Sequence, residues 1–145
     1  MSIVHDFTAA FNRNDVGALV ACFTPGGSYA DGFFGEHRGP DELTAMFARM
    51  FREGRDYAWR LDLVIEAPDR AATEWTFEYV VGDVIQRSAG KRVRFRGMSL
   101  FELEGGKIRA YREYFDLGQA CLQLGFAPEA IAKVLRRELE ASAVT

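Results

Sequence analysis

Acidic and phenolic side chains occur where extended segments of this sequence give way to turns. Asp116 ends the extended part of GKIRAYREYFDLGQ (residues 106–119), and Tyr29 and Asp31 share the short segment SYAD (residues 28–31). An aspartate delivered by a strand end into a dry pocket would have a raised pKa, because burial disfavours its charged form, and could accept a proton. A tyrosine hydroxyl could stabilise the oxyanion formed by such a transfer. We therefore take Asp116, Tyr29 and Asp31 as candidate catalytic residues.

Asp116 also has a structural interpretation. With Gln119 it has the D-x-x-Q spacing of a capping box, and aspartate is a favoured residue at a helix N-terminus. Strand alternation places Arg112, Tyr114 and Asp116 on one face, together with Ile108. If that face is concave, Asp116 enters the pocket, while Arg112 orients it or holds a substrate carboxylate. Asp116 is therefore either a general base or a helix cap.

Asp31 raises a similar choice. Beside Asp116 it would form a coupled pair of carboxylates, whose pKa values move apart so that one acts as acid and the other as base. Alternatively, the stretch YADG (residues 29–32) is a strand end entering a turn, where aspartate is common.

Aromatic residues supply a candidate ligand-binding wall. Trp59 lies in YAWRLDLVIEA (residues 57–67), and Trp75 and Phe77 lie in AATEWTFEYVV (residues 71–81), each on the apolar side of a period-two pattern. These side chains either fill an ordinary core or line a cavity for a flat apolar ring. With Tyr114 and Arg112 they complete the expected substrate-binding set.

The order of periodic segments indicates the fold class. Two short helices near the N-terminus precede the segment SYAD and a clear helix in RGPDELTAMFARMFREG (residues 38–54). The break TPGG (residues 24–27) separates the second helix from SYAD. Strands follow over residues 57–67, 71–81, 92–104 and 107–116. This predicts an α+β fold in one domain, residues 1–145, with a curved antiparallel sheet around the N-terminal helices and an added helix at 128–141.

Composition limits the partners. The net charge of −3 and the pI near 5.4 give no general attraction to nucleic acid, and no apolar run approaches the length of a membrane span. Cys22 and Cys121 are expected to be reduced thiols in a cytoplasmic protein. His5 and His37 stand alone, so we expect no metal site.

The closing stretch GMSLFELEGGKIRAYREYFDLGQ (residues 97–119) resembles the last hairpin of the limonene epoxide hydrolase branch of the nuclear transport factor two-like superfamily. The resemblance covers Ser2 to Gly125. It implies a cone whose apolar pocket is closed by the N-terminal helices, and a convex face used for dimerisation. Asp116 falls on the superfamily's strand-end acid, and Tyr29 and Asp31 fall on a Tyr-x-Asn pair. Trp75 and Phe77 replace an Arg and an Asp of the epoxide hydrolases.

These features predict a SnoaL-like enzyme of the isomerase, cyclase or hydrolase type, with Asp116 as general base. The expected partner is an apolar cyclic small molecule, without metal or organic cofactor, and the expected assembly is a homodimer. One alternative is a non-catalytic binding or assembly module of the same fold. Another is an epoxide hydrolase with an altered site, using Glu74 or Glu78.

Overall fold

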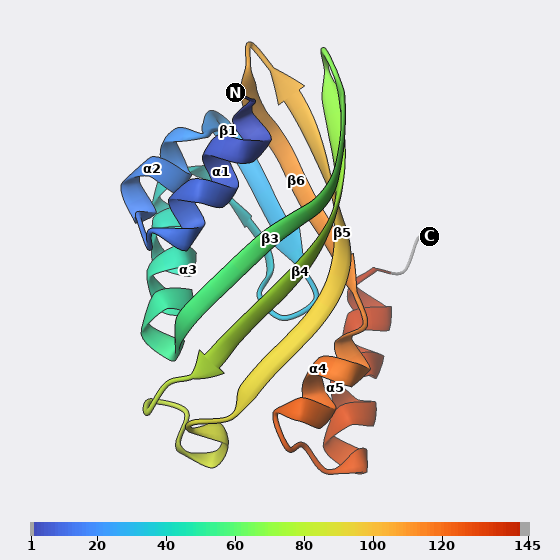
Figure 1. The fold of residues 1–145 in the computed structure, drawn as a ribbon. Helices are drawn as coiled ribbons and strands as arrows, with labels where there is room; N and C mark the ends of the chain where they lie inside the picture. Colours follow the sequence, from blue (N-terminus) through green and yellow to red (C-terminus); the bar gives the residue numbers. More distant parts are fainter. Residues whose placement is uncertain (1, 143–145) are drawn as a thin grey trace.

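The computed structural model describes residues 2–142, and its centre is one curved sheet (Figure 1). The sheet has six strands in the order β2-β1-β6-β5-β4-β3. The strands are β1 (Phe23–Asp31), β2 (Gly35–Arg38), β3 (Gly54–Ala67), β4 (Arg70–Val81), β5 (Arg92–Glu104) and β6 (Lys107–Phe115). The helices are α1 (Ile3–Asn12), α2 (Val16–Ala21), α3 (Gly39–Glu53), the short 3-10 turn η1 (Gln86–Ser88), α4 (Leu117–Gln123) and α5 (Pro128–Ala141). The α+β fold predicted from the sequence is confirmed.

Helices α1, α2 and α3 pack against one face of the sheet, while α4 and α5 lie beside the start of β5, where Gln123 bonds to the backbone of Arg94 (Figure 1). The predicted helix over residues 38–54 is confirmed as α3, with Pro40 in its first turn. Its apolar stripe of Leu43, Met46, Phe47 and Met50 is buried against the sheet. Among residues 2–142, no helix combines the length and apolarity that crossing a membrane requires.

The first strand departs from the sequence prediction. TPGG was expected to break the chain, but β1 runs through these residues to Asp31. It then folds back into β2, where Tyr29 pairs with His37. On its other side β1 is parallel to β6, with Tyr29 opposite Tyr111, so the sheet is not purely antiparallel. This parallel pair brings two strands that are far apart in the sequence together at the centre of the site.

The last strand contains a β-bulge that reverses the predicted alternation. Ala110 pairs with Glu102, and Ile108 pairs with the next residue along β5, Leu103, so Arg109 is an extra residue on β6. A bulge moves every following side chain to the opposite face of the sheet. Ile108 and Tyr111 are therefore both buried although they are three positions apart, an odd spacing that would put them on opposite faces of a regular strand. The prediction that Tyr114 and Asp116 share the inner face with Ile108 is wrong for this reason.

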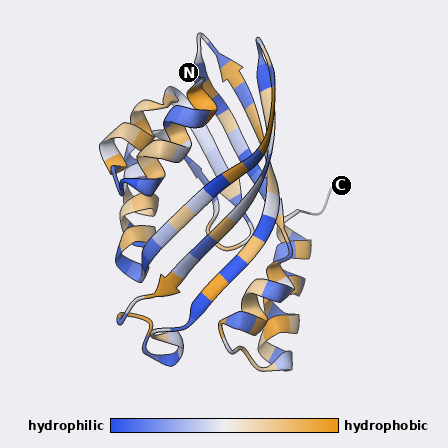
Figure 2. Ribbon diagram, in the orientation of Figure 1, coloured by the Kyte–Doolittle hydropathy of each residue, from blue (hydrophilic) through white to orange (hydrophobic). Residues whose placement is uncertain are grey.

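Alternation holds along the neighbouring strands. Figure 2 shows hydrophilic and hydrophobic bands that alternate along β5. On β4, Trp75 and Phe77 face inward as predicted, and Trp75 is almost completely buried. Gly97 of β5 pairs with Trp75 and leaves room for its ring, because a Cβ atom there would lie 2.6 Å from the indole and 2.7 Å from the Tyr114 carbonyl oxygen.

We predict that Gly97→Ala destabilises the protein. The added methyl group meets a backbone oxygen as well as the indole, and overpacking of this kind costs about 1–3 kcal/mol. Urea unfolding measures the loss. The control is Gly26→Ala, where a Cβ atom meets nothing within 4 Å and should change little. Equal stability of Gly97→Ala and wild type would contradict the close approach.

Candidate functional site

The concave side of the sheet encloses a cavity of about 310 Å³. Its walls are mainly aromatic and aliphatic, and come from α1, α3, η1, the C-terminal segment and all strands except β2. The aromatic lining residues are Phe11, Tyr29, Phe33, Phe34, Tyr57, Trp59, Trp75, Phe77, Tyr79, Phe95, Phe115 and Phe126. The volume is at the lower end of the range of small-molecule sites, roughly 300–1,000 Å³.

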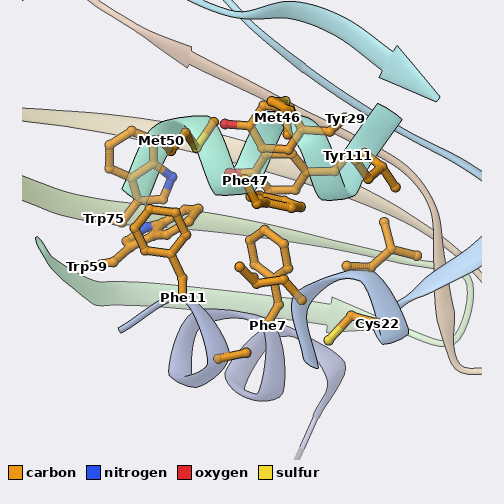
Figure 3. Packing of buried hydrophobic residues seen from close by; sticks show 14 of the residues in the cluster. Phe7, Phe11, Cys22, Tyr29, Met46, Phe47, Met50, Trp59, Trp75 and Tyr111 are labelled. Carbon is orange, nitrogen blue, oxygen red and sulfur yellow. The ribbon is translucent and has the colours of Figure 1, made fainter. Parts of the chain in front are cut away.

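Two acids, Asp31 and Glu113, lie in the mainly apolar wall of this cavity, and the third carboxylate of the lining, Glu53, pairs with Arg49 at 2.8 Å. Asp31 ends β1 and Glu113 lies on β6, each two residues beyond one of the paired tyrosines Tyr29 and Tyr111. The tyrosine rings stack with centroids 4.9 Å apart, and Figure 3 shows them side by side above Phe47 of α3. The parallel β1–β6 pairing therefore places two Tyr-x-acid units next to each other.

Hydrogen bonds join the two acids. The Tyr29 hydroxyl donates to Asp31 Oδ2 at 2.6 Å, and its oxygen lies 3.3 Å from Glu113 Oε1. The Tyr111 hydroxyl donates to Glu113 Oε2 at 2.5 Å. The backbone N–H groups of Phe33 and Phe34 donate to Asp31 Oδ1 at 2.8 and 2.6 Å. Asp31 thus accepts three hydrogen bonds, which favour its charged form.

A buried chain of hydroxyl groups fixes the location of the proton on Glu113. The Trp75 indole can only donate, so Ser99 Oγ accepts from it at 2.7 Å and has its own proton to donate to the Tyr111 oxygen at 2.8 Å. Tyr111 then donates to Glu113 Oε2. Since Oε2 acts as an acceptor, a protonated Glu113 carries its proton on Oε1, which faces Tyr29 and Asp31.

Asp31 and Glu113 lose their protons in different pH ranges. Desolvation and the negative charge of Asp31 raise the pKa of Glu113 to about 8. Burial also raises the pKa of Asp31, but hydrogen bonds from Phe34, Tyr29 and Phe33 oppose this effect. At neutral pH we therefore assign the ionised form to Asp31 and the single proton to Glu113. This gives a base and an acid on either side of the Tyr29 hydroxyl.

The structure brings five of the predicted site residues together at the cavity. They are Tyr29, Asp31, Trp59, Trp75 and Phe77. Trp59 and Trp75 pack edge to face, with ring centroids 5.7 Å apart (Figure 3). The aromatic wall anticipated from the period-two pattern is therefore present, and it lies beside the acid pair.

Asp116 lies outside the cavity. Its exposed carboxylate caps α4 by accepting the backbone N–H of Gln119 at 3.0 Å. Of the two interpretations of Asp116, the helix cap is correct and the placement in the pocket is wrong. The Arg109 bulge explains the error, because it turns Glu113, not Asp116, toward the cavity.

Arg112 and Tyr114 also lie outside the cavity. The Arg112 guanidinium binds Glu102 Oε2 at 2.6 Å, and Tyr114 is 66% exposed. Glu78 forms a 4.0 Å ion pair with Arg94, and Glu74 is exposed, so neither acid replaces the missing epoxide hydrolase residues. The predicted placements of Arg112 and Tyr114 are wrong because of the same change of face, whereas Glu74 and Glu78 lie on the face away from the cavity that strand alternation gives them.

Sequence analysis missed Glu113 and Tyr111. A signal for them exists, because Tyr29-Ala-Asp31 and Tyr111-Arg-Glu113 repeat one Tyr-x-acid pattern. Among residues 2–142, no three His, Cys, Asp or Glu side chains gather as ligands for a metal ion. The acids and tyrosines of the described site are groups that can transfer protons and form hydrogen bonds.

Comparison with known proteins supports the fold. The SnoaL-like domain family matches residues 4–111. A hypothetical protein with a ketosteroid isomerase-like fold from Catenulispora acidiphila, solved with trimethylamine, superposes with a TM-score of 0.77 at 20% identity, covering 88% of this chain and 95% of its own. No curated protein matches the sequence significantly.

Two further structures share the architecture. A proposed polyketide cyclase from Pseudomonas putida has a TM-score of 0.72 at 24% identity, with 85% of this chain and 98% of its own covered. An epoxide hydrolase of the limonene epoxide hydrolase type from M. tuberculosis has a TM-score of 0.70 at 22% identity, with 92% and 93% covered. Identities this low establish a common fold and leave the chemistry to the site itself.

We predict that Glu113 makes stability depend on pH. Its pKa rises on folding from 4.5 to about 8, so the folded state binds the proton more tightly. The contribution of Glu113 to the free energy of unfolding is then largest below pH 4.5. It falls by roughly 3–5 kcal/mol in total as the pH rises to about 8. Urea unfolding at a series of pH values measures this slope.

Glu113→Gln should flatten the pH dependence of the free energy of unfolding. The glutamine amide can accept from Tyr111 and donate toward Tyr29 without ever becoming charged. Glu104→Gln is the matched control, since Glu104 is exposed at the end of β5. Parallel stability curves for wild type and Glu113→Gln would contradict the assignment of the proton.

Proposed function

Because the chain belongs to the SnoaL-like domain family, we propose that it is an enzyme that moves a proton on an apolar, cyclic small molecule. The observation that carries this proposal is the pair Asp31 and Glu113, which share one proton in an aromatic cavity. Burying two carboxylates side by side costs stability, so their retention beside an open cavity favours a catalytic role.

Each polar group has a distinct part in the proposed reaction. Asp31 removes a proton from the carbon next to a substrate carbonyl, and the C–H electron pair moves toward the carbonyl oxygen. Glu113 donates its Oε1 proton to that oxygen, so an enol forms while the pair keeps one proton, now on Asp31. Asp31 then returns the proton to another carbon and Glu113 recovers its own. The net result is an isomerisation with no change in total protons.

The tyrosines hold the acids in their two states. Tyr29 donates to Asp31 and lies between the carboxylates, where its oxygen can accept from Glu113 as the proton moves. Burial and the neighbouring carboxylates raise the pKa values of Tyr29 and Tyr111 well above the usual range, so both remain neutral donors. The aromatic walls favour a flat apolar ring and strengthen the electrostatic interactions by excluding water.

Epoxide hydrolysis is a second candidate, because a structural neighbour is described as an epoxide hydrolase and the same pair suits that reaction. Asp31 would activate a water molecule while Glu113 protonates the epoxide oxygen. The altered epoxide hydrolase site anticipated from the sequence used Glu74 or Glu78. Here Asp31 and Glu113 would take those roles. Ring opening of cyclohexene oxide in ¹⁸O-labelled water tests this candidate directly.

We predict that the protein catalyses hydrogen–deuterium exchange next to the carbonyl of an apolar cyclic ketone. A panel of one- to three-ring ketones is incubated in D₂O, and loss of the α-proton signal is followed by NMR. Asp31→Asn should lower the exchange rate at least about 100-fold, because removing a general base costs roughly 10²–10⁴ in rate. Asp116→Asn is the matched control and should exchange at the wild-type rate, since asparagine also caps helices.

The pH profile of this exchange should be bell-shaped. The rate falls at low pH as Asp31 takes up a proton, and falls above about pH 8 as Glu113 loses its own. Exchange that survives Asp31→Asn, or that is lost equally in Asp116→Asn, would contradict the assignment. Ring binding without exchange or epoxide opening would favour the non-catalytic binding module.

A further inference from the structure

Two arginines stand at the opening of the cavity. Arg87 comes from η1 between β4 and β5, and Arg137 comes from the last turns of α5, yet both line the same cavity and both are exposed. In Figure 1, the yellow-green η1 turn and the red α5 lie at the same end of the sheet. Ser88 Oγ donates to the Leu124 carbonyl oxygen at 2.8 Å and ties η1 to the segment that precedes α5.

Neither arginine is neutralised within residues 2–142, where no carboxylate oxygen lies within 4 Å of either guanidinium. The Arg87 guanidinium rests 5.3 Å from the ring centroid of Phe126, a contact that positions the group and leaves its charge uncompensated. Arg49, the third arginine of the lining, is different, because Glu53 binds it at 2.8 Å.

The charges are therefore separated along the cavity. Among the described residues the buried acid pair carries one negative charge, Glu53 and Arg49 offset each other, and the exposed Arg87 and Arg137 are unpaired at the mouth. An anionic group would be repelled by Asp31 inside and attracted by Arg87 and Arg137 outside. A ring with one anionic substituent can enter in only one orientation, with the ring at the acids and the anion at the mouth.

One side of the mouth lies beyond the family match, whereas Arg87 lies within it. The SnoaL-like match ends at residue 111, and the cavity is completed by Leu124, Phe126, Val134 and Arg137 from later residues. Helix α5 has no buried residue among those described, so its packing does little to explain why these side chains face the cavity. A role in substrate selection accounts for their position.

We infer that the substrate is an apolar ring compound carrying a carboxylate or a similar anionic group, which Arg87 and Arg137 bind at the cavity mouth. This inference rests on the proposed function, because it takes the cavity as the substrate site. Guanidinium groups form paired, charge-assisted hydrogen bonds with carboxylates, which suits this task.

The test compares 2-naphthoate with 2-naphthamide, which share one shape and differ in charge. The chain has two tryptophans, Trp59 and Trp75, and both line the cavity. Their indole N–H signals in ¹H–¹⁵N NMR spectra therefore report binding at this place. We expect wild type to bind naphthoate at least about fivefold more tightly than naphthamide.

The double variant Arg87→Gln/Arg137→Gln should bring this ratio close to one, with naphthamide binding unchanged. Arg136→Gln is the matched control, because Arg136 neighbours Arg137 on α5 but does not line the cavity. Equal affinities in wild type, a ratio that survives the double variant, or no indole shift with either compound would overturn the inference.

Comparing the naphthalene titrations with the ketone exchange of wild type and Asp31→Asn separates this inference from the proposed function. Naphthoate preference that persists while ketone exchange is absent from wild type would retain the anion site and reject the acid–base role. Exchange that depends on Asp31, together with equal affinities for naphthoate and naphthamide, would support the acid–base role and reject the anion site.

Discussion

The site depends on one contact, the parallel pairing of β1 with β6 that sets Tyr29 against Tyr111. Each tyrosine precedes an acid by two residues, so this register places Asp31 and Glu113 on the same inner face. The hydroxyl groups then satisfy carboxylate oxygens that would otherwise be buried without partners. A shift of one residue in the register would turn one acid outward and leave the other alone.

The aromatic core makes this arrangement both costly and useful. Phe7 of α1 contacts Phe47, Trp59, Phe101 and Tyr111 edge to face or at a tilt, so the tyrosine that bonds Glu113 is packed among aromatic rings. Such surroundings offer little to solvate a second negative charge, so Glu113 keeps its proton up to about pH 8. The protein thereby gives up some stability at high pH and holds an acid and a base together at neutral pH.

The same fold supports several chemistries among its structural neighbours, and the differences arise in side chains and additions. In this chain the middle strand presents Trp75 and Phe77 to the cavity, and Trp75 also begins the hydrogen-bond chain to Glu113. The C-terminal residues add Phe126 and Arg137 at the mouth. In the proposed function, the inner acids carry out the reaction and the arginines at the mouth select the molecule that enters.

The sequence by itself determined the α+β class, helix α3, the inward face of β4 and the membership of Tyr29, Asp31, Trp59, Trp75 and Phe77 in one site. The class, the helix and the inward face follow from local periodicity and turn chemistry, whereas the resemblance to the superfamily implied that Tyr29 and Asp31 share a site with the aromatic wall. Only the tertiary structure decided that Glu113, not Asp116, faces the cavity. The Arg109 bulge is set by how β6 pairs with β5 and β1, and pairing between distant strands leaves no periodic signal in a single strand. A single unpaired residue was enough to exchange the inner and outer faces for the rest of β6.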